Sequence, residues 1–178
     1  DFQAVMHHGR TVGGPALRAL TFAERGALLK AMSRALHADR DRLLDVAMTN
    51  GGNTRSDAKF DIDGATFTLS HYARLGAELG DKKLLADGES QVINPAMARF
   101  HGRHFWTSLR GVAVHINAFN FPAWGTFEKA ACALLAGMPV VTKPATSTSW
   151  LAYEMAKIVV DAEILPAGAF QFIGAGRQ

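Results

Sequence analysis

Residues 111–125, GVAVHINAFNFPAWG, constrain the fold more than any other stretch of this chain. β-branched side chains alternate along positions 112–116, which is typical of a strand with one face in a core. Pro122 then supplies a backbone angle φ that suits the first turn of a helix. The stretch therefore predicts a strand that passes through a tight turn into a helix.

Asn120 lies in that turn. In an open α/β sheet, ligands bind beyond the carboxyl ends of the strands, and a side-chain amide held there can donate to an oxygen that develops negative charge. Asn also favours turns for local reasons, because it tolerates left-handed backbone and bonds to neighbouring backbone groups. Two interpretations of Asn120 therefore stay open, an oxyanion donor and a turn former.

The sequence after this turn predicts two more units of an α/β sheet. We expect a helix at 126–136 ended by Gly137, a buried strand at 139–141, a helix capped by Ser147, Thr148 or Ser149 that reaches Asp161, and a strand at 169–173. The connections have the short lengths that right-handed parallel crossovers use. Residues 112–178 therefore read as the first βαβαβ half of a dinucleotide-binding sheet.

The preceding part of the chain is predicted to be helical. A capping box at Thr21 and Glu24 opens a helix over 21–37, a second helix ends at Gly51 and Gly52, and Ser56 caps a third that ends at Gly80.

The polar residues 81–95 read as a surface connection that closes a helical segment, residues 1–95. Residues 96–111 read as a β-ribbon, because Ala98, Phe100 and Phe105 alternate with Arg and His. The predicted class is α/β, with N-terminal helices, a ribbon and half of a Rossmann-like parallel sheet.

Two motifs in this pattern resemble the aldehyde dehydrogenase superfamily. They are Asn120-Phe121-Pro122 and, twenty-three positions after Asn120, Lys143-Pro144-Ala145. The longer segments 13–22 and 114–122 are similar to family members that degrade aromatic compounds as coenzyme A thioesters. The chain departs from most members at Ala118-Phe119, where they carry Pro-Trp.

The resemblance implies roles for particular residues. Asn120 would be the catalytic oxyanion donor, while the nucleophilic Cys and the general-base Glu would belong to sequence beyond Gln178. The ribbon would contribute to the hairpin that pairs subunits, so a homo-oligomer is expected. The implied cofactor-binding residues are Ile116, Asn117, Ala118, Phe119, Lys143, Ala145 and Thr146.

The cofactor expectation rests on Thr146. Many relatives that use NAD carry Glu at this position, where a carboxylate accepts the ribose 2′-hydroxyl and repels a 2′-phosphate. A neutral hydroxyl removes that repulsion, so we expect NADP, with NAD possible. A Thr that only begins a cap would predict no preference. The expected substrate is a semialdehyde, of the kind linked to coenzyme A.

Other candidate groups are weaker. Cys132 lies among Ala and Leu in the predicted helix, so we expect a small buried core residue and no nucleophile. His101 and His104 lack a further ligand at a suitable spacing, so no metal site is predicted. The Gly174 and Gly176 pair lacks the spacing of a phosphate-binding loop.

Composition narrows the class of protein. Of 178 residues 48% are hydrophobic and 20% charged, as in globular proteins. No apolar run approaches the ~18 residues of a membrane span, and the net charge of +3 is not concentrated as nucleic-acid binding requires. One cysteine cannot form an internal disulfide, which favours the cytoplasm.

The chain begins without Met and ends within an apparent strand-to-helix turn, so we expect an N-terminal enzyme fragment that is inactive alone. A non-catalytic nucleotide-binding or interaction module of the same fold is the alternative.

Overall fold

The computed structural model describes residues 1–97 and 99–175, so Ala98 of the predicted ribbon and Gly176 of the glycine pair lie outside the described residues. The helical elements are α1 (Phe2–His8), the π-helical turn η1 (Gly9–Gly13), α2 (Gly14–Ala19), α3 (Phe22–Ala38), α4 (Arg40–Gly51), α5 (Arg55–Leu79), α6 (Trp124–Leu135), the 3₁₀ turn η2 (Thr146–Thr148) and α7 (Ser149–Asp161). The strands are β1 (Leu85–Val92), β2 (His101–Trp106), β3 (Ala113–Ile116), β4 (Val140–Lys143) and β5 (Phe170–Phe172).

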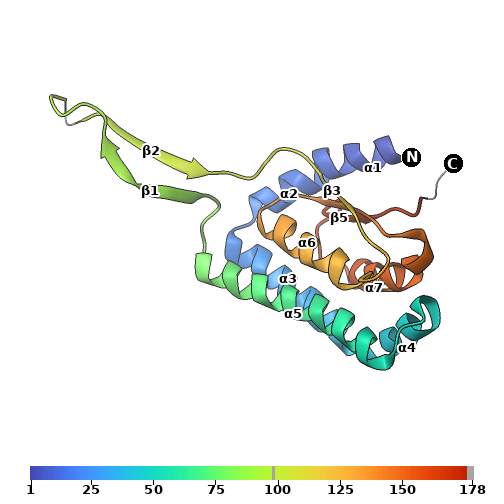
Figure 1. Ribbon diagram of the computed structural model, residues 1–178. Coiled ribbons are helices and arrows are strands. Elements are labelled where there is room, and N and C mark those ends of the chain that lie inside the picture. Colours follow the sequence, from blue (N-terminus) through green and yellow to red (C-terminus); the bar gives the residue numbers. More distant parts are fainter. Residues whose placement is uncertain (98, 176–178) are drawn as a thin grey trace.

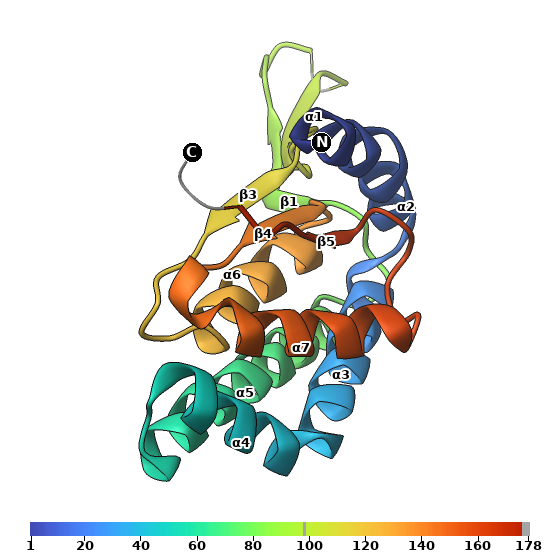
Figure 2. The same ribbon diagram turned by 90° about the vertical axis from the view of Figure 1, so that its right-hand side faces the viewer.

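The elements stack in layers (Figure 1). Strands β3, β4 and β5 form a parallel sheet in that order. Figures 1 and 2 show α6 and α7 against one side of the sheet and α1 on the other, with α3 and α5 beyond α6 and α7. The predicted α/β class, with N-terminal helices ahead of a partial parallel sheet, is confirmed.

Strand β3 turns a different face to the core from the one expected. Ala113 and His115 are partly buried, whereas Val114 and Ile116 are exposed. The predicted alternation is therefore present, but the β-branched face points away from α6. Turn η1 covers only the start of that face, since a Cβ added to Gly9 would meet Val112 at 3.2 Å.

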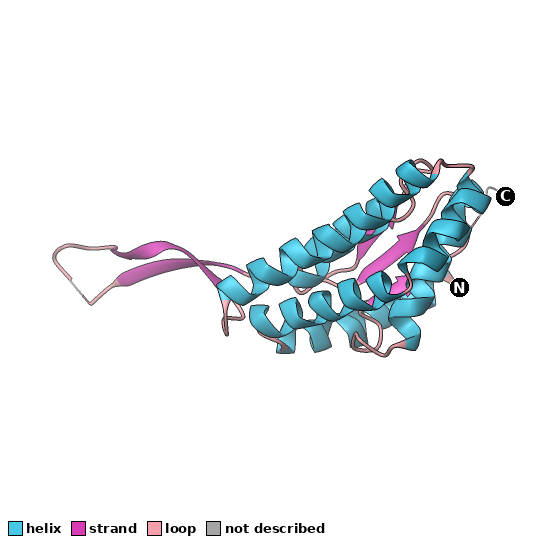
Figure 3. Ribbon diagram, turned by 90° about the horizontal axis from the view of Figure 1, so that it is seen from below, coloured by secondary structure: helices cyan, strands magenta, loops and turns pink. Residues whose placement is uncertain are grey.

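The ribbon begins earlier than predicted. Residues 81–95 contain β1, which pairs antiparallel with β2, so the surface connection and the ribbon start at 96 were wrong. Figure 3 shows this hairpin extending away from the helices. Both faces of β1 are solvent-exposed, so its polar sequence carries no apolar alternation that would reveal a strand.

Several helix ends also differ from prediction. Thr54, and not Ser56, caps α5, because its side chain accepts the backbone N–H of Asp57 at 3.1 Å. Helix α6 starts at Trp124, two residues before the predicted start. Thr148 occupies the N-cap position of α7 but makes no capping bond, since its hydroxyl donates to the carbonyl oxygen of Phe119.

The N-terminal helices α1 and α2 were not predicted. They are short, and α1 ends in two histidines while the η1 turn between them begins and ends with glycine, so tertiary packing has to stabilise this segment. A Cβ added to Gly13 would lie 2.1 Å from the carbonyl oxygen of Gly168. Glycine at position 13 therefore lets η1 approach the loop before β5 closely.

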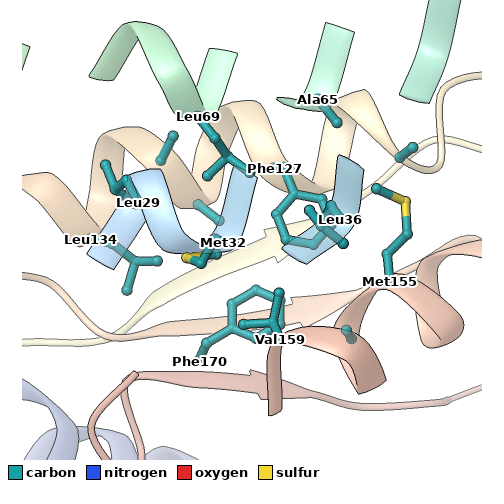
Figure 4. Packing of buried hydrophobic residues seen from close by; sticks show 14 of the residues in the cluster. Leu29, Met32, Leu36, Ala65, Leu69, Phe127, Leu134, Met155, Val159 and Phe170 are labelled. Atoms are coloured by element: carbon teal, nitrogen blue, oxygen red, sulfur yellow. The ribbon is translucent and has the colours of Figure 1, made fainter. Parts of the chain in front are cut away.

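Figure 4 shows one core in which the helical layers and the sheet meet. Its labelled residues come from α3, α5, α6, α7 and β5: Leu29, Met32, Leu36, Ala65, Leu69, Phe127, Leu134, Met155, Val159 and Phe170. The rings of Phe127 and Phe170 stack with centroids 5.9 Å apart, which joins α6 to the sheet. The buried faces of α3 and α6, the helices predicted at 21–37 and 126–136, therefore contribute to a single core.

A buried cation lies within these helices. Arg25 of α3 is 1% exposed, and its Nε donates to the carbonyl oxygen of Leu135 at 2.8 Å. Its Nη1 donates to the carbonyl oxygens of Leu17 and Leu20 at 3.1 and 2.8 Å. Burial lowers the pKa of Arg25, but three carbonyls compensate for lost water. Arg25 thus satisfies the ends of both α2 and α6.

We predict that Arg25→Met lowers the free energy of unfolding by about 3 kcal/mol, because it leaves buried carbonyls without donors. Urea denaturation of the protein measures this loss. Arg34→Met, on the exposed side of the same helix, is the matched control and should change stability by less than about 0.5 kcal/mol. Equal effects of the two changes would contradict the role given to Arg25.

Candidate functional site

The predicted cofactor residues gather at the carboxyl edge of the sheet. Ile116 at the end of β3 pairs in register with Lys143 at the end of β4, and the N–H of Asn117 donates to the carbonyl oxygen of Lys143 at 3.0 Å. Ile116 is 74% exposed, and the Lys143 Nζ donates to the carbonyl oxygen of Pro144 at 2.9 Å. Two of the predicted side chains therefore lie side by side where open α/β sheets bind ligands.

A hydrogen bond joins the loops that follow these strands. The Thr148 hydroxyl donates to the carbonyl oxygen of Phe119 at 2.9 Å, which ties the loop after β4 to the loop after β3. Ala118, Phe119 and Thr146 are exposed, and Ala145 is half-buried. The cofactor role of these residues stays a prediction, and the structure places them along one edge of the sheet.

Asn117 differs from the other predicted residues because its side chain points inward. The residue is buried, and its Nδ2 donates to the hydroxyls of Thr126 at 3.0 Å and Thr142 at 2.8 Å. Thr126 in turn donates to the carbonyl oxygen of Pro122 at 2.7 Å. The side chain of Asn117 therefore fastens the turn to α6 and β4 and is not free to bind a cofactor.

Asn120 lies exposed in the turn between β3 and α6. It lines a hollow of about 460 Å³ between this turn and the turn that joins α4 to α5. Within the described residues its side-chain amide has no hydrogen-bond partner. A residue present only to shape the turn would bond to local backbone. The donor role of Asn120 stays a prediction, and its exposed amide is free to meet a ligand.

Aromatic rings surround the start of α6. The ring centroid of Phe121 lies 6.1 Å from that of Phe60 and 6.2 Å from that of Trp124, in edge-to-face geometry. The indole N–H of Trp124 donates to the Thr68 hydroxyl at 3.0 Å. Trp124 lies directly over Gly64, where a Cβ would come within 2.5 Å of the indole. Helix α5 therefore packs closely against the turn.

Asp61 of α5, which was not predicted from the sequence, lies against the start of α6. It is 1% exposed, and its carboxylate accepts the backbone N–H groups of Ala123 at 3.1 Å and Trp124 at 2.7 Å. Burial raises the pKa of Asp61 to about 6, and the two N–H bonds oppose that rise. A carboxylate within the apolar stripe of α5, between Ala58 and Ala65, is the signal that could have revealed it.

Cys132 is exposed on α6, so the prediction of a buried core residue was wrong. The helix is composed of small apolar residues nearly all round at this point, and Ala130, Ala131 and Leu134 take its buried face. Proximity to Cys132 raises the pKa of Tyr72 on α5. Cys132 is two helical turns beyond Trp124, roughly 12 Å along the axis. It is therefore remote from Asn120, and its lack of a nucleophilic role stays a prediction.

The part of the chain that the structure describes holds no group of three or more His, Cys, Asp or Glu arranged to bind a metal ion. In the same residues, no helix combines the length and the apolar character needed to cross a membrane.

Known proteins with similar sequences are dehydrogenases of aldehydes. The profile of the Aldehyde dehydrogenase family matches residues 2–178. The chain is 50% identical over 176 residues to 3,4-dehydroadipyl-CoA semialdehyde dehydrogenase of Aromatoleum evansii, covering 99% of this chain and 34% of that protein. It is 29% identical to the NADP(+) succinate-semialdehyde dehydrogenase GabD of Escherichia coli K12, covering 89% of this chain and 31% of that protein.

Solved structures share the fold. An NADP-dependent enzyme of E. coli superposes with a TM-score of 0.80 at 27% identity, covering 98% of this chain and 34% of its own. An NAD-dependent benzaldehyde dehydrogenase of Corynebacterium glutamicum gives 0.82 at 22% identity, covering 100% of this chain and 36% of its own. The chain thus spans about a third of the length of the relatives it matches. Since the family profile covers nearly every residue, this chain belongs to the aldehyde dehydrogenase family.

Proposed function

We propose that this chain is the N-terminal, cofactor-binding part of an NADP-dependent aldehyde dehydrogenase. The complete enzyme oxidises a semialdehyde linked to coenzyme A to a carboxylic acid, in the degradation of aromatic compounds in the cytoplasm. The observation that carries the proposal is the free amide of Asn120, exposed at the carboxyl edge of the parallel sheet. The 50% identity to a dehydrogenase of a CoA semialdehyde supports the substrate class.

The proposed chemistry divides between this chain and the rest of the enzyme. A cysteine thiolate supplied by another part of the complete protein attacks the aldehyde carbon, since Cys132 lies far along α6. The carbonyl oxygen then becomes an oxyanion, and the Asn120 Nδ2 donates a hydrogen bond to it. The bond stabilises this species more than the free aldehyde, so it lowers the barrier. The bound NADP would accept the hydride from the same carbon.

The residues at the sheet edge fit such a cofactor. Lys143 is half-buried with its ammonium group at the end of β4, where it can exchange its local carbonyl for a ribose hydroxyl. Thr146 is exposed at the start of η2, and its neutral hydroxyl leaves space for a 2′-phosphate without charge repulsion. Lys143 supports a nucleotide cofactor of either kind, and Thr146 supports NADP over NAD.

The proposed assembly is a homo-oligomer that forms through the β1–β2 hairpin. Phe105 and Trp106 of β2 are 51% and 65% exposed, and the hairpin projects from the helices (Figure 3). A two-stranded ribbon is at best marginally stable in water and presents unpaired edges. A second copy of the chain would cover both the apolar side chains and an edge.

We predict that Asn120→Ala in the complete enzyme lowers kcat by roughly 10² to 10³, about 3 kcal/mol, with little change in KM. Asn120→Asp should be at least as harmful, because an acceptor-only carboxylate would face the developing negative charge. Pre-steady-state NADPH formation measures the effect, and melting temperatures serve as the control. A normal burst rate together with a lowered melting temperature would restrict Asn120 to shaping the turn.

We predict that Thr146→Glu weakens NADP binding roughly tenfold or more while NAD binding changes far less, because the carboxylate repels the 2′-phosphate. Titration of each cofactor into the complete enzyme gives both dissociation constants. Thr146→Gln, which is of similar size but uncharged, is the matched control and should keep the preference for NADP. Equal weakening of the two cofactors by Glu would refute the assignment.

A further inference from the structure

Helix α6 begins without a cap from its own sequence. Its N-cap residue, Ala123, has no side-chain acceptor, and Pro122 before it has no backbone N–H. The N–H groups of Ala123 and Trp124 instead donate to the two carboxylate oxygens of Asp61, at 3.1 and 2.7 Å. A residue of α5, more than sixty positions earlier, therefore caps the helix that follows Asn120.

Other hydrogen bonds hold the same turn. The side chain of Asn117 anchors its beginning to Thr126 and Thr142, and the hydroxyl of Thr148 holds the carbonyl oxygen of Phe119. These interactions are uncharged, whereas the Asp61 carboxylate also meets the positive end of the α6 dipole. Asp61 thus provides a charged hydrogen-bond acceptor for the backbone that follows Asn120.

We propose that Asp61 is a positioning residue for the oxyanion site, fixing the start of α6 and thereby the backbone that carries the Asn120 amide. The inference rests on the proposed function, in which Asn120 donates to the oxyanion. Asp61 is buried and its oxygens face two backbone N–H groups, so it acts through the turn and does not touch substrate. Asp61 positions the group that reacts with substrate, and it neither gives nor takes a proton in the reaction.

The loss of rate expected from a change at Asp61 depends on how precisely a catalytic group has to be positioned. Catalytic groups have to be held within roughly 0.5 Å of the productive geometry, and a displacement of about 1 Å can cost 10²-fold in rate. Asp61→Asn keeps the shape of the side chain but offers one acceptor oxygen, and its NH₂ group faces the second backbone N–H. The change therefore leaves one of the two backbone N–H groups without an acceptor and opens no cavity.

The test is a double-mutant cycle in the complete enzyme, measured as the single-turnover rate of NADPH formation. Asp61→Asn should lower this rate roughly 10- to 100-fold while KM changes less than about twofold. In an Asn120→Ala background the same change should cost less than about twofold, because the group that Asp61 positions is then absent. Asp61→Glu, which keeps both oxygens, should recover part of the rate.

Asp63→Asn is the matched control. Asp63 lies two residues along α5 and binds Arg40 at 2.6 and 2.7 Å, so its loss removes a carboxylate of the same helix without touching α6. It should leave the single-turnover rate unchanged. If Asp61→Asn does not fold, Asp61→Glu in the two backgrounds takes its place in the cycle.

The outcomes separate the two proposals. A slow Asn120→Ala enzyme with a normal Asp61→Asn enzyme, or with independent multiplicative losses, overturns only the positioning role. A normal rate for Asn120→Ala overturns the proposed function, and the positioning role falls with it. A non-additive loss confined to the rate supports both.

Discussion

Helix α6 is held at its two ends by buried charges of opposite sign. Asp61 accepts two N–H groups at its first turn, and Arg25 donates to the carbonyl oxygen of Leu135 at its last residue. Each charge complements the end of the helix dipole that it meets. Both residues are 1% exposed and bond to backbone groups, which makes their burial less costly than that of unpaired ions, while the Arg25 Nη2 has no partner among the described residues.

This arrangement links the helical layer to the site. Asp61 comes from α5 and Arg25 from α3, which pack together beyond α6 (Figure 1). The position of α6 along its axis is therefore set from outside the sheet, while Phe127 sets its contact with β5. The turn with Asn120 precedes the first of these anchored ends. Helices α3 and α5 thus fix the position of α6 and, through it, the turn at the carboxyl edge of the sheet.

The sequence predicts those parts of this arrangement that depend on local chemistry. The capping box at Thr21, the end of α5 at Gly80 and the strand at 112–116 follow from hydrogen-bonding side chains, glycine φ angles and alternation over a few residues. That β3 and β4 end at one edge follows equally from the rule for parallel strands, whereas the pairing of Ile116 with Lys143 does not, because the predicted strand at 139–141 ended before Lys143.

The remainder depends on partners that are distant in sequence. Asp61 bonds to residues more than sixty positions away, so no window around it predicts a cap. The turn η1 between the N-terminal helices, which begins and ends with glycine, is stabilised by contact with the loop before β5, against its low helix propensity. The hairpin strand β1 has no buried face, and Cys132 lies on the outer side of a helix that is apolar nearly all round. In each of these cases tertiary packing decides the outcome.

The long sequence separation between Arg25 and Leu135 also affects folding during synthesis. This side chain emerges from the ribosome 110 positions before the carbonyl oxygen of Leu135 that it binds. Helices α3 and α5 are local in sequence and can form early, but their inner faces then carry an arginine and an aspartate without their α6 partners. A nascent chain that ends before α6 therefore exposes ionic groups within apolar surface. The helical layer completes its packing only when the following α/β segment has been synthesised.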